Sequence, residues 1–186
     1  MRPAFALIAL LVACTPSTRD VQMSPRRASL TPSGDLSPIR TCEQAIGVLD
    51  PDPERGVGTI VLGRVWFPSR PTDALRPARP RTPQGNLFYK QGISVRAGTL
   101  ITMTVPDAFS HLYALDFAGG PIESTSALGE GERTIRIQPC PRDSQGPWTA
   151  FSGGFLAPQP ACVTVIVRTD ARSERLRVGL GTGCQI

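Results

Sequence analysis

The chain contains a single histidine, His111, so a hydrolytic site would have one candidate base of that type. Nucleophilic hydrolysis needs a base within hydrogen-bond reach of a serine hydroxyl, and Ser110 is the immediate neighbour of His111. The surrounding apolar alternation predicts a strand there, on which neighbouring side chains point to opposite faces and cannot act together. Ser152 lacks the Gly-x-Ser-x-Gly spacing of a nucleophile elbow. We therefore expect no catalytic residue, and we interpret Gly153 and Gly154 as a bend in a strand.

Two groups of carboxylates have residue types that could bind a metal or transfer protons. Three carboxylates alternate with proline in 50–54 (DPDPE), as at the start of a calcium loop. The pattern then fails, because the glycine arrives one residue late and Val61 occupies the place of the bidentate glutamate. Glu130 and Glu132 match glycosidase carboxylates in type alone, and we expect them to face solvent on a turn before a strand. The sequence predicts no metal and no cofactor.

Positive charge is spread along the chain rather than gathered in one block. The formal net charge is +5, and Lys90 is the sole lysine. A basic balance of this kind is poor evidence for a nucleic-acid partner, and we expect none. The segment Pro68–Asn86 is the longest one without a strand pattern, and its five prolines alternate with arginines. Long loops are functional or simply solvated, so the arginines of this segment are candidate contacts for an acidic partner or phosphate headgroups: Arg70, Arg76, Arg79 and Arg81.

The few large aromatic residues determine how well the chain could bind a sugar. Stacking on sugar rings needs several aromatic rings on one exposed face, whereas aromatic residues of β-sandwiches usually fill the core. We expect core positions for four of them: Trp66, Tyr89, Tyr113 and Trp148. An extracytoplasmic small-ligand or carbohydrate-binding domain is therefore the second interpretation of the chain, and a hydrolase is the third.

The first residues have the three parts of an export signal. Arg2 precedes an apolar stretch, 5–12, that is too short to span a bilayer and ends at a small residue. The segment 11–14 (LVAC) resembles the lipobox of bacterial lipoproteins. The resemblance implies that 1–13 is removed and that Cys14 becomes the lipidated N-terminus. It also implies that the rest of the chain lies on the extracytoplasmic face of the cell membrane, where stable anchoring takes two or more acyl chains.

Four cysteines remain after the lipobox, and an extracytoplasmic compartment allows them to form disulfides: Cys42, Cys140, Cys162 and Cys184. Four cysteines have three pairings. We favour Cys140 with Cys162, which would join neighbouring strands. Cys42 would then pair with Cys184 and tie the two ends of the domain together. A metal site is the weaker alternative, because no Cys-x-x-Cys spacing occurs. The glycines of 179–183 would let the chain turn so that Cys184 reaches its partner.

The apolar pattern divides the mature chain into a tether and one domain. The segment 14–40 is rich in Ser, Thr, Pro and Arg and too poor in apolar residues to fold, so we expect a disordered tether. The domain, 41–186, alternates apolar and polar residues with a period near two. Thr41 and Gln44 could cap one short helical turn. About eight strands are predicted: Gly58–Phe67, Leu87–Val95, Thr99–Val105, His111–Ala118, Arg133–Cys140, Trp148–Leu156, Cys162–Thr169 and Glu174–Leu180, the last two joined by a hairpin at 170–172.

Strands at this spacing predict an all-β fold, an antiparallel sandwich of two sheets that could be immunoglobulin-like. In the C-terminal half, the segments 140–141 (CP), 148–155 (WTAFSGGF) and 161–163 (ACV), with the closing 178–179 (VG) before Cys184, resemble a group of small uncharacterised secreted proteins and lipoproteins of actinobacteria. The resemblance implies two disulfides and an envelope location, and it implies no activity. We therefore expect a non-catalytic interaction or accessory module that contacts the membrane through its lipid and binds an envelope protein or a wall polymer.

Overall fold

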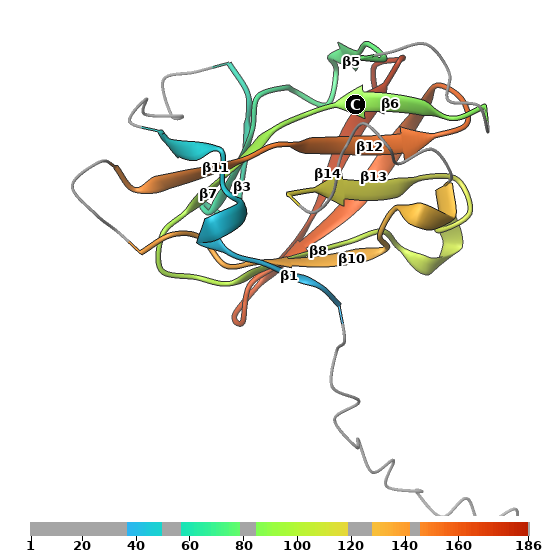
Figure 1. Ribbon diagram of the computed structural model, residues 1–186. Coiled ribbons are helices and arrows are strands. Elements are labelled where there is room, and N and C mark those ends of the chain that lie inside the picture. The colour runs from blue at the N-terminus through green and yellow to red at the C-terminus, as the bar shows by residue number, and fades with distance from the viewer. Residues whose placement is uncertain (1–36, 50–56, 79–84, 119–127, 142–145, 186) are drawn as a thin grey trace, which may run out of the picture. The chain divides into compact units, whose positions relative to one another are not determined.

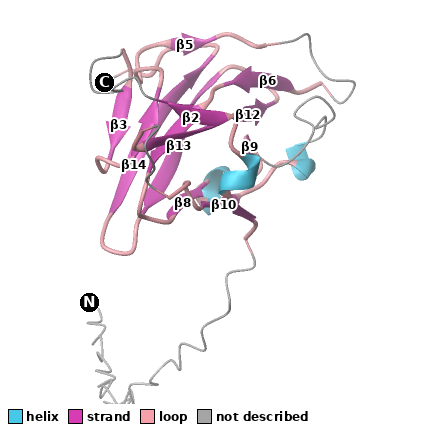
Figure 2. Cartoon of the chain, turned by 60° about the vertical axis from the view of Figure 1, so that its left-hand side comes forward, coloured by secondary structure: helices cyan, strands magenta, loops and turns pink. Residues whose placement is uncertain are grey.

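A computed structural model describes residues 37–49, 57–78, 85–118, 128–141 and 146–185, all within the compact unit Leu36–Ile186. These residues form fourteen strands and three short 3-10 helices (Figures 1 and 2), which confirms the predicted all-β class. The 3-10 helices are η1 (Cys42–Gln44), η3 (Asp107–Phe109) and η4 (Leu128–Glu130). Gln44 supports η1 as expected, since its side-chain oxygen accepts the backbone N–H of Thr41 at 2.9 Å.

The first layer is a six-stranded sheet. Its strands, in spatial order, are β1 (Ile39–Arg40), β10 (Thr134–Ile137), β8 (Ile101–Thr104), β13 (Ala161–Arg168), β14 (Ser173–Leu180) and β5 (Ala74–Leu75). The inner four-strand block is antiparallel, whereas the two edge strands, β1 and β5, run parallel to their neighbours. β13 and β14 form the hairpin predicted at 170–172, which Thr169 closes by donating its N–H to the carbonyl of Arg172 at 2.9 Å.

The second layer consists of a five-stranded and a three-stranded sheet. The five-stranded sheet has the order β2 (Gly47–Leu49), β11 (Trp148–Phe151), β7 (Ile93–Arg96), β4 (Val65–Phe67) and β3 (Thr59–Val61). The three-stranded sheet has the order β6 (Leu87–Lys90), β12 (Gly153–Ala157) and β9 (Ala114–Phe117). Because β6 leads into β7 and β11 into β12, while β11 pairs with β7 and β12 with β6, the two sheets are halves of one bent layer (Figure 1).

The bend in this layer lies where glycine was expected to bend a strand. Ser152 separates β11 from β12, and the Gln91 N–H bridges the break by donating to the Gly153 carbonyl at 2.8 Å. A Cβ at Gly154 would lie 2.2 Å from the backbone oxygen of Tyr89, so only glycine allows the two strands to approach this closely. The predicted strands 87–95 and 148–156 were therefore wrong as single strands, because each changes sheet at the bend.

A tight turn also divides the predicted strand Gly58–Phe67, which is the hairpin of β3 and β4. Leu62 and Gly63 have φ of 55° and 63°, and Arg64 donates its N–H to the carbonyl of Val61 at 3.0 Å. Two successive positive φ values define the turn that matches the twist of a two-residue hairpin. The sequence analysis missed it because leucine is an unusual residue at the first of these positions.

Three of the remaining predicted strands, β8, β9 and β10, are present but shorter than expected, whereas β13 and β14 match their predicted bounds to within one residue. The segment Pro68–Asn86 is not wholly irregular either, since it contains β5, which pairs with β14. β1 also corrects the expected start of the domain at Thr41, because Ile39 and Arg40 pair with β10 and belong to the first sheet rather than to the tether.

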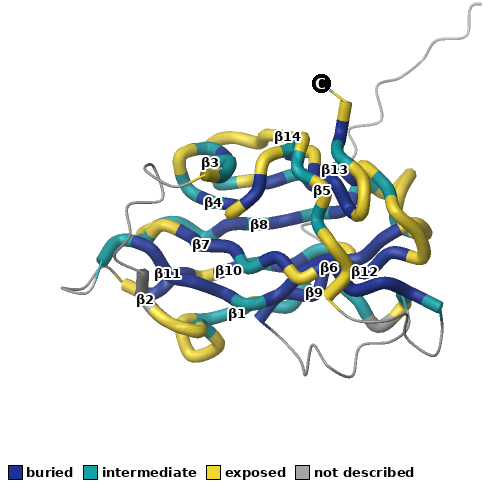
Figure 3. Tube along the Cα trace, turned by 90° about the horizontal axis from the view of Figure 1, so that it is seen from above, coloured by how far each residue is buried: buried dark blue, intermediate teal, exposed yellow. Residues whose placement is uncertain are grey.

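The core lies between the two layers (Figure 3). Inward positions of the strands alternate with outward ones, as in β13, whose buried residues are Val163, Val165 and Val167. Phe117 from β9 and Phe155 from β12 meet edge-to-face with ring centroids 5.6 Å apart. The predicted period-two alternation is confirmed here.

The favoured disulfide pairing was wrong, because Cys42 bonds to Cys140 and Cys162 bonds to Cys184. The parallel pairing of β1 with β10 sets Arg40 beside Ile137, so the residues that follow these two strands, Cys42 and Cys140, also lie side by side. Their Cα atoms are 4.6 Å apart. β10 and β13 are not neighbours, since β8 lies between them, and this separates Cys140 from Cys162.

The second disulfide depends on the glycine-rich end of the chain. Cys162 is opposite Gly179 in the β13–β14 ladder, and the chain then turns back so that Cys184 reaches Cys162 with a Cα–Cα distance of 5.2 Å. Gly181 has a φ of 68°, and a Cβ at Gly183 would lie 2.4 Å from the backbone oxygen of Thr72. The interpretation of these glycines as a turn that serves Cys184 is confirmed, with a different partner.

Candidate functional site

The serine and histidine residues that were considered for hydrolysis do not form a common site in the fold. Ser110 and His111 are in the turn after η3 and not on a strand as predicted, and the Ser110 hydroxyl donates to the Asp107 carbonyl at 2.9 Å. His111 is exposed. Ser152 lies at the bend of the second layer, where its carbonyl accepts the Ala118 N–H at 2.9 Å. The structure brings none of these side chains together.

The structure describes two of the four arginines that were predicted to contact an acidic partner. Arg70 is exposed, and its guanidinium lies 3.6 Å from the carboxylate of Asp73, which also accepts the Arg70 backbone N–H at 2.7 Å. Arg76 is exposed directly after β5. Arg79 and Arg81 lie outside the described residues, as do the lipobox with Cys14 and the acidic segment 50–54. In the described ranges no three metal-ligating side chains cluster.

Glu132 does not face solvent as the sequence analysis expected. Its carboxylate forms an ion pair with the guanidinium of Arg40, and the two side chains are 25% and 13% exposed. The same guanidinium donates through Nε to the carbonyl of Phe117 at 3.0 Å. Backbone bonds between Glu132 and Leu115 join the two layers at this point. The pair therefore stabilises the contact between the layers.

Burial raises the pKa of the Glu132 carboxyl above its usual value, although the neighbouring Arg40 charge acts in the opposite direction. The carboxylate of Asp116, which is 8% exposed on β9, adds to the rise. Glu130, the other carboxylate that matches a glycosidase site in type, is the last residue of η4, and its side chain lies outside the described part of the structure.

The outer face of the six-stranded sheet carries an arginine cluster that the sequence analysis missed. The register places Arg136, Thr102 and Arg168 next to one another across β10, β8 and β13. Arg175 and Arg177 alternate on β14 and point to the same side. We call this surface the arginine–threonine face: Arg136, Arg168, Arg175 and Arg177 with Thr102, Thr104, Thr134 and Thr164.

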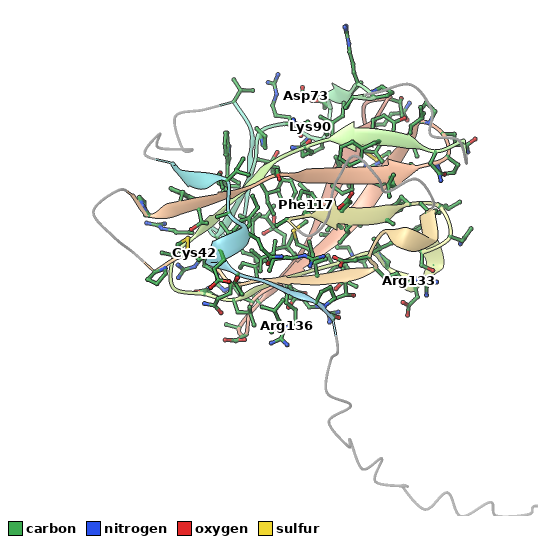
Figure 4. The ribbon with its side chains drawn as sticks, viewed as in Figure 1. Cys42, Asp73, Lys90, Phe117, Arg133 and Arg136 are labelled. Carbon is green, nitrogen blue, oxygen red and sulfur yellow. A yellow bond between two sulfur atoms is a disulfide. The ribbon has the colours of Figure 1, made fainter. Side chains whose placement is uncertain are left out.

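No acidic residue takes an outward position in the described strands of this face. Glu174 on β14 has the opposite parity and turns toward β3, where it accepts the Leu62 N–H at 3.1 Å. Figure 4 shows Arg136 pointing away from the core and from Phe117. Like charges on neighbouring positions of a sheet repel one another and destabilise it. Arg175 is a diagonal neighbour of Arg168, whose direct partner is Ser173, so the repulsion between these outward arginines is weaker than between directly opposite charges.

The face also adjoins the point where the chain enters the domain. Ile39 of the edge strand β1 is opposite Arg136 and is 47% exposed on the outer side. The alternation that reveals the cluster is visible in 174–178 (ERLRV), where arginines flank a buried leucine. Sequence alone does not show that β10 and β13 add their arginines to the same side.

A second concave region lies at the end of the sandwich where three loops meet. One open hollow of about 360 Å³ is lined by Leu62, Arg64, Thr99 and the hairpin residues 169–172. A second, of about 490 Å³, is lined by Leu62, Gly63, Arg64, Arg96, Ala97 and Pro147. Leu62 and Arg64 line both hollows, so the two adjoin at the β3–β4 turn.

Three of the four large aromatic residues occupy the core as predicted, and Trp66 does not. Tyr89, Tyr113 and Trp148 are at most 4% exposed, and Trp66 is half-buried on β4. The Tyr113 hydroxyl donates to the carbonyl of Thr164 and accepts its N–H. It therefore supplies backbone hydrogen bonds to the part of β13 that does not pair with β8. None of the four lines either hollow at the loop end.

No protein-family model matches this chain, and no curated protein matches it either. Within the described ranges there is no helix with the length and apolar character needed to cross a bilayer. The candidate sites therefore depend on the geometry and charge of the chain itself.

Proposed function

We propose that this chain is an exported lipoprotein, lipidated at Cys14, and that its domain is a non-catalytic interaction module at the extracytoplasmic face of the cell membrane. Its arginine–threonine face lies against the anionic headgroups of the bilayer that holds the lipid. The observation that carries the proposal is the outward row of arginines, which has no acidic residue beside it in the described strands of the sheet.

Charge supports this orientation. A basic side chain near an anionic membrane surface contributes about 1 kcal/mol to binding, so four arginines contribute up to about 4 kcal/mol. The hydroxyls of the threonines and the exposed side chain of Ile39 can enter the same interface without adding negative charge.

The path of the chain supports it as well. The segment between Cys14 and Ser37, if flexible, has a reach of roughly 30 Å, and it leads to β1 at the edge of the face. A lipid inserted at the start of this segment would hold the domain close to the bilayer. The weak binding of the face would then act at a high local concentration.

The face and the lipid can be tested separately. The full chain with Cys14→Ser lacks the lipid, so its sedimentation with vesicles reports the face alone. We expect it to bind phosphatidylglycerol-containing vesicles at low salt and to bind phosphatidylcholine vesicles much more weakly. The double variant R168Q/R175Q should bind the anionic vesicles about thirtyfold more weakly, since it loses about 2 kcal/mol.

The matched control is R70Q/R76Q, which removes the same charge from the arginine segment that the sequence analysis favoured. This control should bind nearly as well as the parent chain. Equal losses in both double variants would overturn the role of the face. An unmodified Cys14 in the intact mass of protein extracted from membranes would overturn the lipid anchor.

A further inference from the structure

We infer that the loop end of the sandwich binds a linear phosphate-bearing polymer, with successive phosphates in the two hollows and Arg64 between them. This site is separate from the arginine–threonine face and goes beyond the membrane contact proposed for that face.

Each hollow contains a pair of arginines. Arg64 and Arg172 line the first hollow, and Arg64 and Arg96 line the second. A guanidinium donates two parallel hydrogen bonds to an oxyanion, and this fork suits phosphate and carboxylate. An internal phosphate of a polymer, like a carboxylate, has two charged oxygens, but its tetrahedral centre lets two guanidinium groups approach these oxygens from different directions, whereas the acceptor sites of a carboxylate lie in one plane. Two arginines in one hollow therefore favour phosphate.

The sharing of Arg64 points to a chain of phosphates rather than to a single one. Both hollows are open to solvent, and they meet at Leu62 and Arg64. A lone phosphate would occupy one hollow and leave the arginine that is particular to the other hollow, Arg96 or Arg172, unused. A polymer that crosses the β3–β4 turn would use both pairs, and its second contact would be intramolecular and therefore stronger.

The backbone around the site is held in place before any ligand binds. Leu62 has the left-handed φ of 55°, and its N–H is fixed by the Glu174 carboxylate at 3.1 Å. The Arg96 N–H donates to the Arg64 carbonyl at 2.8 Å, and its guanidinium lies 5.9 Å from the ring centroid of Trp148. A non-glycine residue with a left-handed backbone is costly and persists where the surrounding structure enforces it. Preorganisation of this kind reduces the entropy lost on binding.

The two hollows differ in one respect that can be tested. Asp170 lines the hollow of Arg172, whereas among the residues that the structure describes no acidic one lines the hollow of Arg96. The carboxylate of Asp170 opposes an anion in its own hollow. We therefore expect the Arg96 hollow to bind phosphate more strongly, and Asp170→Asn to strengthen the binding of the polymer.

Calorimetric titration of the full Cys14→Ser chain tests the inference, with inorganic phosphate, long-chain inorganic polyphosphate and polyglutamate as probes. At equal phosphate concentration, polyphosphate should bind at least tenfold more tightly than phosphate and more tightly than polyglutamate. Arg64→Gln should remove most of this gain, because it affects both hollows. Arg96→Gln and Arg172→Gln should each weaken polyphosphate binding several-fold, and Asp170→Asn should tighten it.

The matched control is R168Q/R175Q, which removes two arginines from the arginine–threonine face and should change polyphosphate binding much less than Arg64→Gln alone. Equal affinity for phosphate and polyphosphate would overturn the inference. A loss of polyphosphate affinity in R168Q/R175Q as large as in Arg64→Gln would also overturn the inference, because the polyanion would then bind to the arginine–threonine face. Tighter binding of polyglutamate would overturn the choice of phosphate. Vesicle binding by Arg64→Gln should stay unchanged, so the two proposals can fail independently.

Discussion

Arg40 and Arg136 lie on adjacent strands of one sheet in opposite electrostatic settings. Arg40 points inward from β1, where the Glu132 carboxylate and the Phe117 carbonyl accept its donors. Arg136 points outward from β10, next to Thr102 and in a row with Arg168. The inner arginine has an acidic partner and is 13% exposed, whereas the outer arginines have no acidic residue on their side of the described strands.

The difference shows which charges the fold itself requires. A half-buried guanidinium needs a partner, because an uncompensated charge is costly inside a protein. Of the outer arginines, Arg177 donates a hydrogen bond to the Gln185 carbonyl, and none is directly opposite another arginine in the ladder. The outer arginines have no acidic partner on their side of the described strands, and the contact that we propose with anionic headgroups would supply one.

Loss of the Cys42–Cys140 disulfide should have the largest effect on this arrangement, because it holds the edge strand β1 beside β10. The bond closes a segment of 98 residues, and loop-closure entropy for that length is worth about 4.7 kcal/mol. We expect C42S/C140S to lose several kcal/mol of unfolding free energy in denaturant titrations. C162S/C184S, whose bond spans 22 residues, should lose less, about 3 kcal/mol. The reverse order would contradict this account.

Two neighbouring residues of β10, one inward and one outward, allow the stability effects of the two sides of the sheet to be compared directly. Ile137 is fully buried, and Ile137→Ala should cost about 2 to 5 kcal/mol through the lost apolar contacts and the cavity left behind. Arg136→Ala should change the unfolding free energy by no more than about 0.5 kcal/mol but weaken binding to anionic vesicles. Urea unfolding of the two variants, followed by vesicle sedimentation of Arg136→Ala, measures both effects. A large loss of stability in Arg136→Ala would show that this arginine serves the fold.

Arg40→Gln tests the compensated charge on the inner side. It leaves the Glu132 carboxylate half-buried without a cation, and since the pair is partly exposed we expect a loss of about 1 to 2 kcal/mol. Arg136→Gln is the matched control on the outer side and should leave the unfolding free energy nearly unchanged. Similar values for the two variants would remove the distinction between the faces.

Alternation and turn chemistry were enough to predict the class of fold. The two-residue period located the strands, and the glycines of 152–154 correctly indicated a bend. The β3–β4 turn was missed because Leu62 has a backbone conformation that leucine rarely adopts. The disulfide pairing depends on the parallel contact of β1 with β10, and no local pattern in the sequence predicts which distant strands become neighbours.

The same limit applies to the candidate sites. The arginine segment was noticed because its members are close in sequence, yet Arg70 is partnered with Asp73. The arginine–threonine face collects its members from β8, β10, β13 and β14, and the loop-end site collects Arg64 and Arg172 from two turns and Arg96 from the end of β7. Such surfaces follow from topology, which short-range spacing does not specify.

The smallest expected effect concerns the pH dependence of the inner ion pair. Because burial raises the pKa of Glu132, the folded chain favours the protonated carboxyl more than the unfolded chain does. The contribution of the Glu132 carboxyl to the free energy of unfolding is therefore greatest below pH 4.5, the ordinary pKa of this group. It declines as the pH rises from there through the raised pKa of the folded chain. Glu132→Gln cannot titrate, so the unfolding free energy of the parent chain relative to this variant should fall over that range.

Urea titrations of both chains between about pH 4 and pH 7 would measure this difference, which we expect to be small because Arg40 opposes the effect of burial. Glu43→Gln, a change at an exposed carboxylate on η1, is the matched control for losing one negative charge. A relative stability that rises with pH would mean that attraction to Arg40 outweighs desolvation at Glu132. The inner pair would then be a strong salt bridge, and its contrast with the outer arginines would be greater than the structure indicates.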